Sequence, residues 1–297
     1  MRTTRVLISA AAAVMFVGAM GVTAQASLTH NYDFAGSTGN TDTVGGTSGT
    51  LENGATLVSG TGVVLSNGGL GAGNTGSNPA TAQYDSLGSN LLPTNGSATI
   101  EEYFQPASSA SGGYSQEFDF NNGPGSNSGA TSSDYLLGVA SYPNNGGFSS
   151  HIALNTGNGE TDSSPAGYID APGGAGGANV MVAAVIDGTN NTLSYYLNGT
   201  LVGTPTAIPA GTSLAVFNNV NTWLGISPFA SDPALNATLQ SFRIFNNPLT
   251  ASQIAADNAA GPNGPISESP AIPEPATLGL LGVGAVGMLA RRKRKTA

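Results

Sequence analysis

Short runs in which apolar and polar residues alternate recur along the middle of the chain, and they predict an all-β domain. A period of two places one face of a strand in a core and the other face toward solvent. The first run shows this period at Leu28, His30, Tyr32 and Phe34. The same criteria predict further strands over residues 55–59, 62–65, 99–105, 134–140, 147–154, 179–187, 192–197, 201–202 and 238–245.

Asn-Gly pairs lie between or beside many of these runs. Such a pair supplies the positive φ angles that a tight hairpin turn requires. The pairs begin at Asn53, Asn67, Asn95, Asn122, Asn145, Asn158, Asn198 and Asn263. Their number favours many short antiparallel strands joined by turns.

One helix in the middle of the chain has signals at both ends. Thr250 is a suitable N-cap, and Gln253 three residues later completes a capping box. Leu249 and Ile254 occupy the two positions of a hydrophobic staple. The Gly-Pro pair at 261–262 ends the helix, so the pattern predicts a short helix directly after the last strand.

The N-terminus has the pattern of a secretory signal peptide over residues 1–26. Two arginines in the first five residues precede an apolar, Ala-rich run over 6–22. Ala24 and Ala26 then form an A-x-A site for signal peptidase, which makes Ser27 the first mature residue. The alternative is an uncleaved N-terminal anchor, against which the polar, Gly-rich sequence that follows argues. The chain is therefore expected to cross a membrane.

The C-terminus combines three features in a fixed order. Pro273, Glu274 and Pro275 come first, an apolar run over 276–290 follows, and a basic cluster over 291–295 ends it. As a helix the apolar run spans roughly 22 Å, which is less than the hydrocarbon core of about 30 Å. It fits a span in a locally thinned membrane, with the basic cluster on the cytoplasmic side. An ordinary single-span anchor is the alternative interpretation.

This order of motif, short apolar helix and basic end closely resembles the PEP-CTERM sorting tail of exported bacterial proteins. The resemblance implies an exosortase as partner, which would recognise the tail, cut near the motif and release or transfer the body. The body would then be anchored in the membrane only transiently, on its way to the cell surface or the extracellular matrix. The chain divides into the signal peptide, one domain over 27–262, a flexible Pro/Gly-rich linker over 263–272 and the tail over 273–297.

The charges of the central domain are almost all negative. Sixteen of the seventeen acidic residues lie between residues 27 and 271, whereas Arg243 is the only one of the eight basic residues there. Such a surface is a poor partner for nucleic acid or anionic lipid and a reasonable one for calcium. The alternative is that the acids serve solubility alone. The chain has no cysteine, which excludes disulfides and thiolate chemistry.

Several segments in order resemble LamG-like, concanavalin A-like domains. The matching segments are residues 32–34, Asp42, 51–57, 99–106, 187–199, 239–245 and 249–254. The resemblance implies a two-sheet antiparallel jelly-roll sandwich that closes with a strand and a short helix. It also implies a structural calcium ion near an early aspartate, which Asp42 matches, although Gln240 stands where many members have an acid. The alternative for Asp42 is a turn residue.

Candidate catalytic and metal-binding residues are few. Glu117, Asp119 and Asn121 resemble the catalytic strand of family 16 glycoside hydrolases, but Asn121 replaces the second glutamate. A retaining mechanism needs two carboxyl groups. Glu117 and Asp119 are therefore expected on the outward face of a strand, and no catalytic residue is assigned. His30 and His151 lie on different predicted strands, where packed or exposed histidines are the alternative to a metal pair.

Three functions fit these features. The first is a non-catalytic surface or matrix protein that binds glycans, with Tyr103, Tyr195 and Tyr196 as candidate platforms for sugar rings. The second is a purely structural component of the envelope. The third, a glycoside hydrolase on the same fold, is disfavoured by the missing acid and by Trp223 being the only tryptophan.

Overall fold

The computed structural model describes residues 26–68, 76–107, 114–123, 134–140, 150–157, 160–163 and 179–267. The predicted signal peptide apart from Ala26, the apolar run over 276–290 and the whole sorting tail lie outside these residues. Along the part of the chain that is described, no helix is both long enough and apolar enough to span a membrane.

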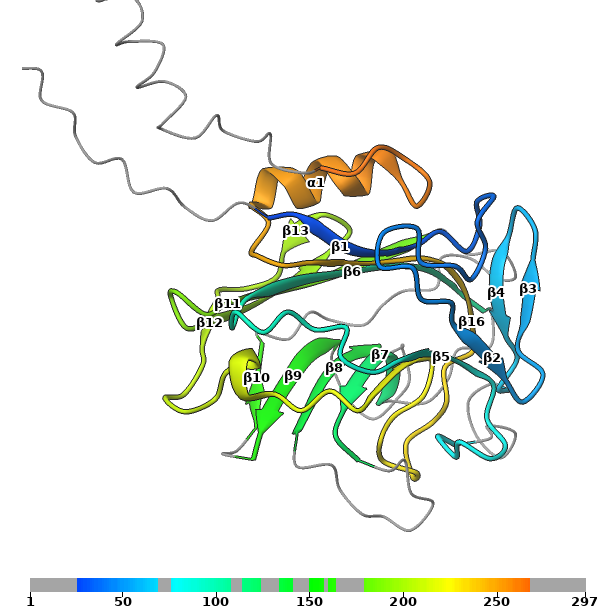
Figure 1. Cartoon of the computed structure of the whole chain (residues 1–297), viewed down its shortest axis with the longest axis horizontal. Helices are drawn as coiled ribbons and strands as arrows, with labels where there is room; N and C mark the ends of the chain where they lie inside the picture. The colour runs from blue at the N-terminus through cyan, green and yellow to red at the C-terminus, as the bar shows by residue number, and fades with distance from the viewer. Residues whose placement is uncertain are drawn as a thin grey trace, which may run out of the picture.

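Two antiparallel sheets packed face to face form the domain, as the sequence predicted (Figure 1). The first sheet has the order β13-β12-β11-β6-β16-β4-β3, with β1 also paired to β16 and β14 to β12. Its strands are β1 (Leu28–Tyr32), β3 (Thr56–Val58), β4 (Gly62–Leu65), β6 (Ala98–Pro106), β11 (Val180–Asp187), β12 (Thr192–Leu197), β13 (Thr200–Leu201), β14 (Thr206–Ala207) and β16 (Ala237–Phe245).

The second sheet has the order β10-β9-β8-β7-β15-β5-β2. Its strands are β2 (Thr50–Glu52), β5 (Tyr84–Gly88), β7 (Ser115–Asn121), β8 (Asp134–Ala140), β9 (His151–Thr156), β10 (Thr161–Asp162) and β15 (Asn221–Leu224). Pairing is antiparallel throughout the described strands, for example Leu136 opposite Phe120 and Leu154. The two sheets therefore each keep one inner and one outer face.

The main core lies between the inner faces of the two sheets. Ile100 and Phe104 of β6 face Phe118 and Phe120 of β7, and all four are fully buried. The ring of Phe242, on β16, lies 6.2 Å from the rings of both Phe118 and Phe120. Every second residue along these strands thus points inward, and the inward-facing side chains of both sheets together form the core, as is usual in a β-sandwich.

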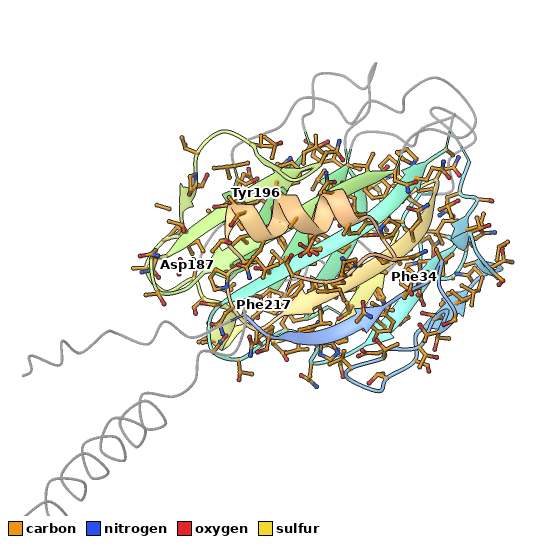
Figure 2. All side chains as sticks on the ribbon, turned by 90° about the horizontal axis from the view of Figure 1, so that it is seen from above. Phe34, Asp187, Tyr196 and Phe217 are labelled. Carbon is orange, nitrogen blue, oxygen red and sulfur yellow. The ribbon has the colours of Figure 1, made fainter. Side chains whose placement is uncertain are left out.

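One short helix, α1 (Ala251–Ala260), lies across the outer face of the first sheet (Figure 2). The predicted capping box is present: Thr250 Oγ1 accepts the Gln253 N–H at 3.3 Å, and Gln253 Oε1 accepts the Thr250 N–H at 2.9 Å. Ile254 and Leu249 are buried with Tyr196 in a second apolar cluster beneath the helix. A 3-10 turn, η1 (Leu214–Val216), is a further helical element.

The segment after α1 is held against the domain. Ser267 N–H donates to Asp257 Oδ1 at 2.6 Å, and Ile266 packs against the cluster beneath α1. Two residues of the predicted flexible linker over 263–272, Ile266 and Ser267, therefore have contacts with the domain, and the flexibility of the linker stays a prediction. Residues 268–272 of that linker lie outside the described residues.

Candidate functional site

A pocket opens on the outer face of the second sheet, the face that points away from α1 (Figure 1). Three neighbouring strands build its floor, and their register brings Gln116, Val139 and His151 into one row across β7, β8 and β9. Leu137 and Ala153, which form the next outward-facing pair on β8 and β9, complete the floor. The pocket has a volume of about 160 Å³, which suits one sugar residue or a part of it better than a large ligand.

The loop between β15 and β16 forms one wall of the pocket through Phe229 and Asp232. Ser227 shapes this loop: its hydroxyl accepts the Phe229 N–H at 3.0 Å and donates to Asp232 Oδ2 at 2.7 Å. The Asp232 N–H donates a hydrogen bond to the Phe229 carbonyl at 3.0 Å, which closes the turn. Ser77 N–H then donates to the Asp232 carbonyl at 2.6 Å, which ties the loop to a distant segment. The wall is thus preformed.

Aromatic and acidic side chains surround the opening. Tyr114 lines the opening and is 40% exposed. Phe229 packs edge to face on Tyr135, with ring centroids 5.6 Å apart. The Tyr135 hydroxyl donates to Glu160 Oε2 in a short hydrogen bond, which orients that carboxylate at the rim. The opening therefore combines ring faces with hydrogen-bond acceptors.

Hydrogen-bond acceptors dominate the polar groups of the pocket. Gln116 Nε2 donates to Asp232 Oδ2 at 3.3 Å. Because a carboxylate only accepts hydrogen bonds, this contact fixes the amide and leaves Gln116 Oε1 as the acceptor. Gln116 is 1% exposed, and among the described residues its Oε1 has no hydrogen-bond partner. A donor from a ligand would satisfy this buried oxygen.

Burial raises the pKa of Asp232, which lines the pocket, and of Asp162, which lies on β10 beside His151. For Asp232 burial is the main cause, and the hydrogen bonds from Ser227 and Gln116 oppose it. For Asp162 burial acts first and the neighbouring Glu160 adds to it, whereas His151 lowers the pKa. His151 Nε2 lies 3.9 Å from Asp162 Oδ1. Burial makes the charged carboxylates unfavourable, and a positively charged or hydrogen-bond-donating ligand would stabilise them.

Sequence reasoning did not identify the residues of this pocket, apart from considering His151 as a metal ligand. The strands that carry the floor were predicted, or noted as a short strand in the case of β7, but their order in the sheet was not. The loop over 227–233, with Phe229 and Asp232 between two prolines, was the strongest local signal available. An aromatic residue and an acid in a proline-bounded turn are typical of a preformed binding loop.

The expectation that Glu117 and Asp119 lie on the outward face of a strand is wrong for Glu117, and both side chains are fully buried. A register shift in β7 places two residues opposite Gly138, and a Cβ on that glycine would lie 2.6 Å from both Glu117 Oε2 and Phe118 Cε1. Glu117 therefore points inward beside the core residue Phe118. Asp119 stays on the outer side but is covered, and it accepts a hydrogen bond from Asn121 Nδ2 at 2.6 Å.

Glu117 shares the sandwich interior with Glu102 of the opposite sheet. Glu102 lies between Ile100 and Phe104 on the same, inner face of β6, and it is also fully buried. Burial raises the pKa of Glu117 to about 8. Burial, followed by the nearby Glu117, raises the pKa of Glu102 well above its usual range. Neither carboxyl has a hydrogen-bond partner among the described residues.

The three tyrosines expected to stack on sugars are not available to a ligand. Tyr195 is fully buried in the main core, because it lies on the inner face of β12. Tyr103 and Tyr196 lie on the outer face of the same sheet, but α1 covers them, and they are 2% and 7% exposed. Figure 2 shows Tyr196 beside the helix. That prediction is therefore wrong.

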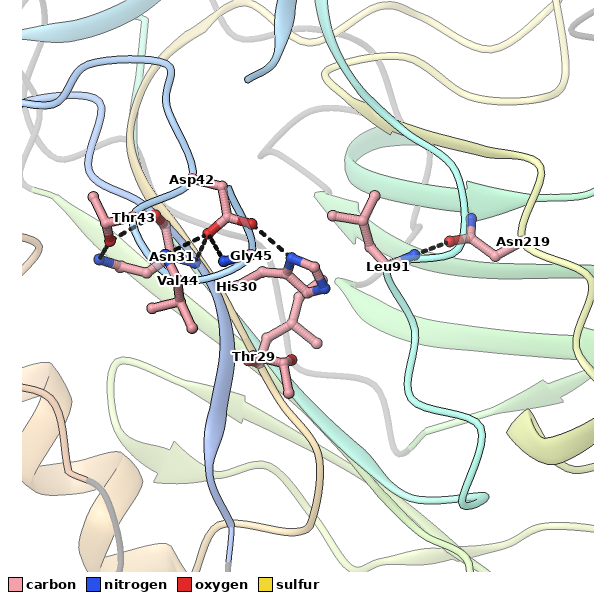
Figure 3. A network of polar contacts seen from close by, with 10 residues as sticks. Thr29, His30, Asn31, Asp42, Thr43, Val44, Gly45, Leu91 and Asn219 are labelled. Atoms are coloured by element: carbon pink, nitrogen blue, oxygen red, sulfur yellow. Dashed lines mark hydrogen bonds and ion pairs between the residues drawn. The ribbon is translucent and has the colours of Figure 1, made fainter. Parts of the chain in front are cut away.

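Asp42 holds a turn next to β1 (Figure 3). Its Oδ1 accepts the N–H groups of Asn31, Val44 and Gly45 at 2.9, 3.0 and 2.8 Å, and its Oδ2 lies 2.7 Å from His30 Nδ1. Burial acts to raise the pKa of Asp42, but these hydrogen bonds outweigh it and hold the pKa below its usual value. The alternative interpretation of Asp42 as a turn residue thus has direct support. A calcium ion at Asp42 stays a prediction.

The two histidines do not form a pair. His30 lies on β1 of the first sheet beside Asp42, and His151 lies on β9 of the second sheet beside Asp162. Across the described ranges no group of three or more His, Asp or Glu side chains is placed to hold a metal ion.

The comparison with protein families agrees with this architecture. A family model described as the concanavalin A-like lectin/glucanases superfamily matches residues 77–255, more than half of the chain. The chain belongs to this superfamily. A second model, the PEP-CTERM protein-sorting motif, matches residues 271–295. The motif indicates export and sorting at a membrane, which confirms the resemblance of the C-terminal tail.

Solved structures with the same fold include a domain of a glycoside hydrolase and the binding domain of a toxin. Domain 4 of AbnA, a GH43 extracellular arabinanase from Geobacillus stearothermophilus solved with arabinotriose, has a TM-score of 0.54 and 17% identity. That match covers 78% of this chain and 98% of the other. The binding domain of botulinum neurotoxin DC, solved with rat synaptotagmin II, has a TM-score of 0.50 and 14% identity, covering 80% and 51%. At these identities the similarity establishes the fold alone. No curated protein is a match.

Proposed function

We propose that this chain is an exported bacterial surface or matrix protein that binds a glycan in the outer-face pocket without cleaving it. The observation that carries the proposal is the pocket itself, in which an apolar floor and aromatic walls surround several hydrogen-bond acceptors. Sugars combine apolar ring faces with hydroxyl donors. Pockets that join aromatic surface to a few placed polar groups suit such ligands.

The roles within the pocket follow from exposure and chemistry. Tyr114 and Phe229 offer ring surface at the opening, and Leu137, Val139 and Ala153 offer apolar surface at the floor. Gln116 Oε1 and the carboxylate of Asp232 accept hydroxyl donors. The arabinotriose bound to a domain of the same fold supports a glycan as the ligand here.

The positions of the acids favour binding over hydrolysis. A retaining glycosidase needs two carboxyl groups about 5 Å apart on either side of the sugar bond. Glu117 and Asp119, which resemble a catalytic strand in sequence, are fully buried. Glu117 points into the sandwich, so a substrate in the pocket would not reach it.

The two ends of the domain lie near α1, on the side of the sandwich opposite the pocket. Leu28, near the first described residue, and Ile266, near the last, both pack against the cluster beneath α1. The pocket lies on the outer face of the second sheet, which is the sheet farther from α1 in Figure 1. If residues 276–290 anchor the protein before an exosortase acts on the tail, the pocket faces away from the membrane. The same arrangement suits transfer to the surface or matrix after processing.

A glycan array probed with the full chain, purified in a nonionic detergent, tests this proposal. Retention of at least one polysaccharide class, with no release of reducing ends on prolonged incubation, is expected. An array without any retained glycan would favour a purely structural envelope component. Release of reducing ends that Glu117→Gln abolishes would make the protein a hydrolase.

A further inference from the structure

The pocket contains several hydrogen-bond acceptors, and the domain around it has almost no positively charged side chains. Between residues 27 and 271 the chain has a single Lys or Arg, Arg243, and that side chain is 1% exposed beneath α1. No guanidinium or ammonium side chain of this domain is therefore available to a ligand. Uronate, sialate and phosphate groups are commonly recognised by such cations.

The acids at the pocket are arranged to meet a cation. Asp232 lines one wall, Glu160 lies at the rim, and Asp162 follows on β10. Both hydrogen bonds to Asp232 use Oδ2, so neither of them engages Oδ1. His151 is the one titratable base in the lining, and it is directed to Asp162 at 3.9 Å.

Gln116 gives an independent reason to expect a donor in the pocket. Its Oε1 is buried and has no hydrogen-bond partner among the described residues, while its Nε2 is held by Asp232. A ligand group between Gln116 and Asp232 must therefore donate hydrogen bonds to both. An ammonium carries three donors and a positive charge, whereas a hydroxyl carries one donor.

We propose that the pocket selects a glycan with protonated amino groups, a polymer of de-N-acetylated hexosamine, over its N-acetylated and uronate counterparts. This inference rests on the proposed glycan-binding function and names the class of ligand. The ammonium lies between Asp232 and Gln116 Oε1, and the ring packs against Tyr114 or Phe229. Charge-assisted hydrogen bonds are shorter and roughly twice as strong as neutral ones.

Titration calorimetry of the full chain in nonionic detergent tests the selection with three oligosaccharides of equal length. They are built from glucosamine, N-acetylglucosamine and galacturonic acid. At low ionic strength we expect the glucosamine oligomer to bind at least about tenfold more tightly than the N-acetyl form. We expect no measurable binding of the galacturonate. The preference should weaken at about 500 mM NaCl, because salt screens the charge interaction.

Two variants locate the interaction. Asp232→Asn and Gln116→Met keep the size of each side chain and should each weaken glucosamine-oligomer binding about tenfold. Asp187→Asn removes the same charge at the end of β11 in the other sheet, and it should leave binding unchanged. A thermal melt of each variant checks that it is folded.

The outcomes separate the two proposals. Equal binding of the glucosamine and N-acetylglucosamine oligomers would overturn the selection and leave glycan binding in place. Equal losses in Asp187→Asn and Asp232→Asn would also overturn it, because they would indicate attraction to the acidic surface in general. Failure of the glucosamine oligomer to bind contradicts the selection, and failure of every glycan on the array contradicts the proposed function.

Discussion

Arg243 Nη2 donates a hydrogen bond to the carbonyl oxygen of Pro262 at 2.6 Å, so the only Lys or Arg side chain of the domain holds the segment after α1. The guanidinium also lies 3.7 Å from Glu101 Oε2 and 5.2 Å from the ring centre of Tyr103. Arg243 and Glu101 are both buried. This contact joins the last strand of the sandwich to the chain that leads toward the sorting tail.

Arg243→Met should therefore destabilise the domain and release residues 262–267. Loss of the cation leaves Glu101 and Asp257 buried together without a positive partner, which costs about 3 kcal/mol. Denaturant unfolding measures the loss, and hydrogen exchange measures the release. The double variant Arg243→Met/Glu101→Gln should recover part of the stability. A single variant that unfolds at the wild-type midpoint would contradict this account of the cluster.

Thr250→Ala should lower the unfolding free energy by about 1 kcal/mol, because it removes the oxygen that caps α1. Gln253→Ala removes the other half of the same capping box. The two losses should be less than additive, since either change breaks the reciprocal pair. Urea melts of the two single variants and the double variant measure this coupling. Fully additive losses would mean that the two caps act independently.

The stability of the domain should fall as the pH rises from about 4.5 to about 8. Burial raises the pKa of Glu117 to about 8 in the folded state, whereas the unfolded chain has an ordinary value. Between these values the folded state binds more protons, so the unfolding free energy decreases with pH. The buried Asp85, with its pKa raised to about 7, acts in the same direction.

Glu117→Gln tests this pH dependence because glutamine resembles the neutral acid. The variant should melt at a higher temperature than wild type at pH 8 and should show a flatter profile between pH 5 and 8. The difference should be on the order of a few kcal/mol. Asp187→Asn, which removes a carboxyl outside the core, serves as the control. A profile of Glu117→Gln as steep as that of wild type would contradict a buried neutral Glu117.

Processing at both ends is a further prediction from the sequence. The mature protein should begin at Ser27 and lack the basic cluster over 291–295. Ser27 N–H donates to Asn246 Oδ1 at 2.8 Å, a contact that a new amino terminus could keep. Intact mass spectrometry of envelope and medium fractions from a host with an exosortase measures both ends. A dominant species that retains the basic cluster would be the contrary result.

The sequence predicted those parts of the fold that depend on local signals. The α1 cap follows from Thr250 and Gln253, and the Asn198-Gly199 turn has the expected positive φ angles of 49° and 76°. Strands with clear periodicity were also found, and β8 and β12 have the predicted bounds. The short strands β5 and β15 were missed because polar residues, Asp85 and Thr222, occupy buried positions in them and obscure the apolar pattern.

The candidate site could not be predicted in the same way. Gln116 and Asp232 meet only because β7 lies beside β15 in the sheet, an arrangement that depends on long-range pairing. The inward direction of Glu117 depends on a register shift opposite Gly138. Strict alternation along β7 places Glu117 and Asp119 on the same, outward face. The register shift between Gln116 and Asp119 turns the side chain of Glu117 to the inner face instead.

Glycan binding by the outer-face pocket is the central claim, and titration calorimetry of Phe229→Ala tests it most directly. The titrant is the glycan that the wild-type chain retains best on the array. Loss of the ring that forms one wall should weaken binding at least about tenfold. Leu57→Ala removes an exposed apolar side chain from β3 of the other sheet and should bind as wild type does. A folded Phe229→Ala variant with unchanged affinity would contradict the assignment of this pocket.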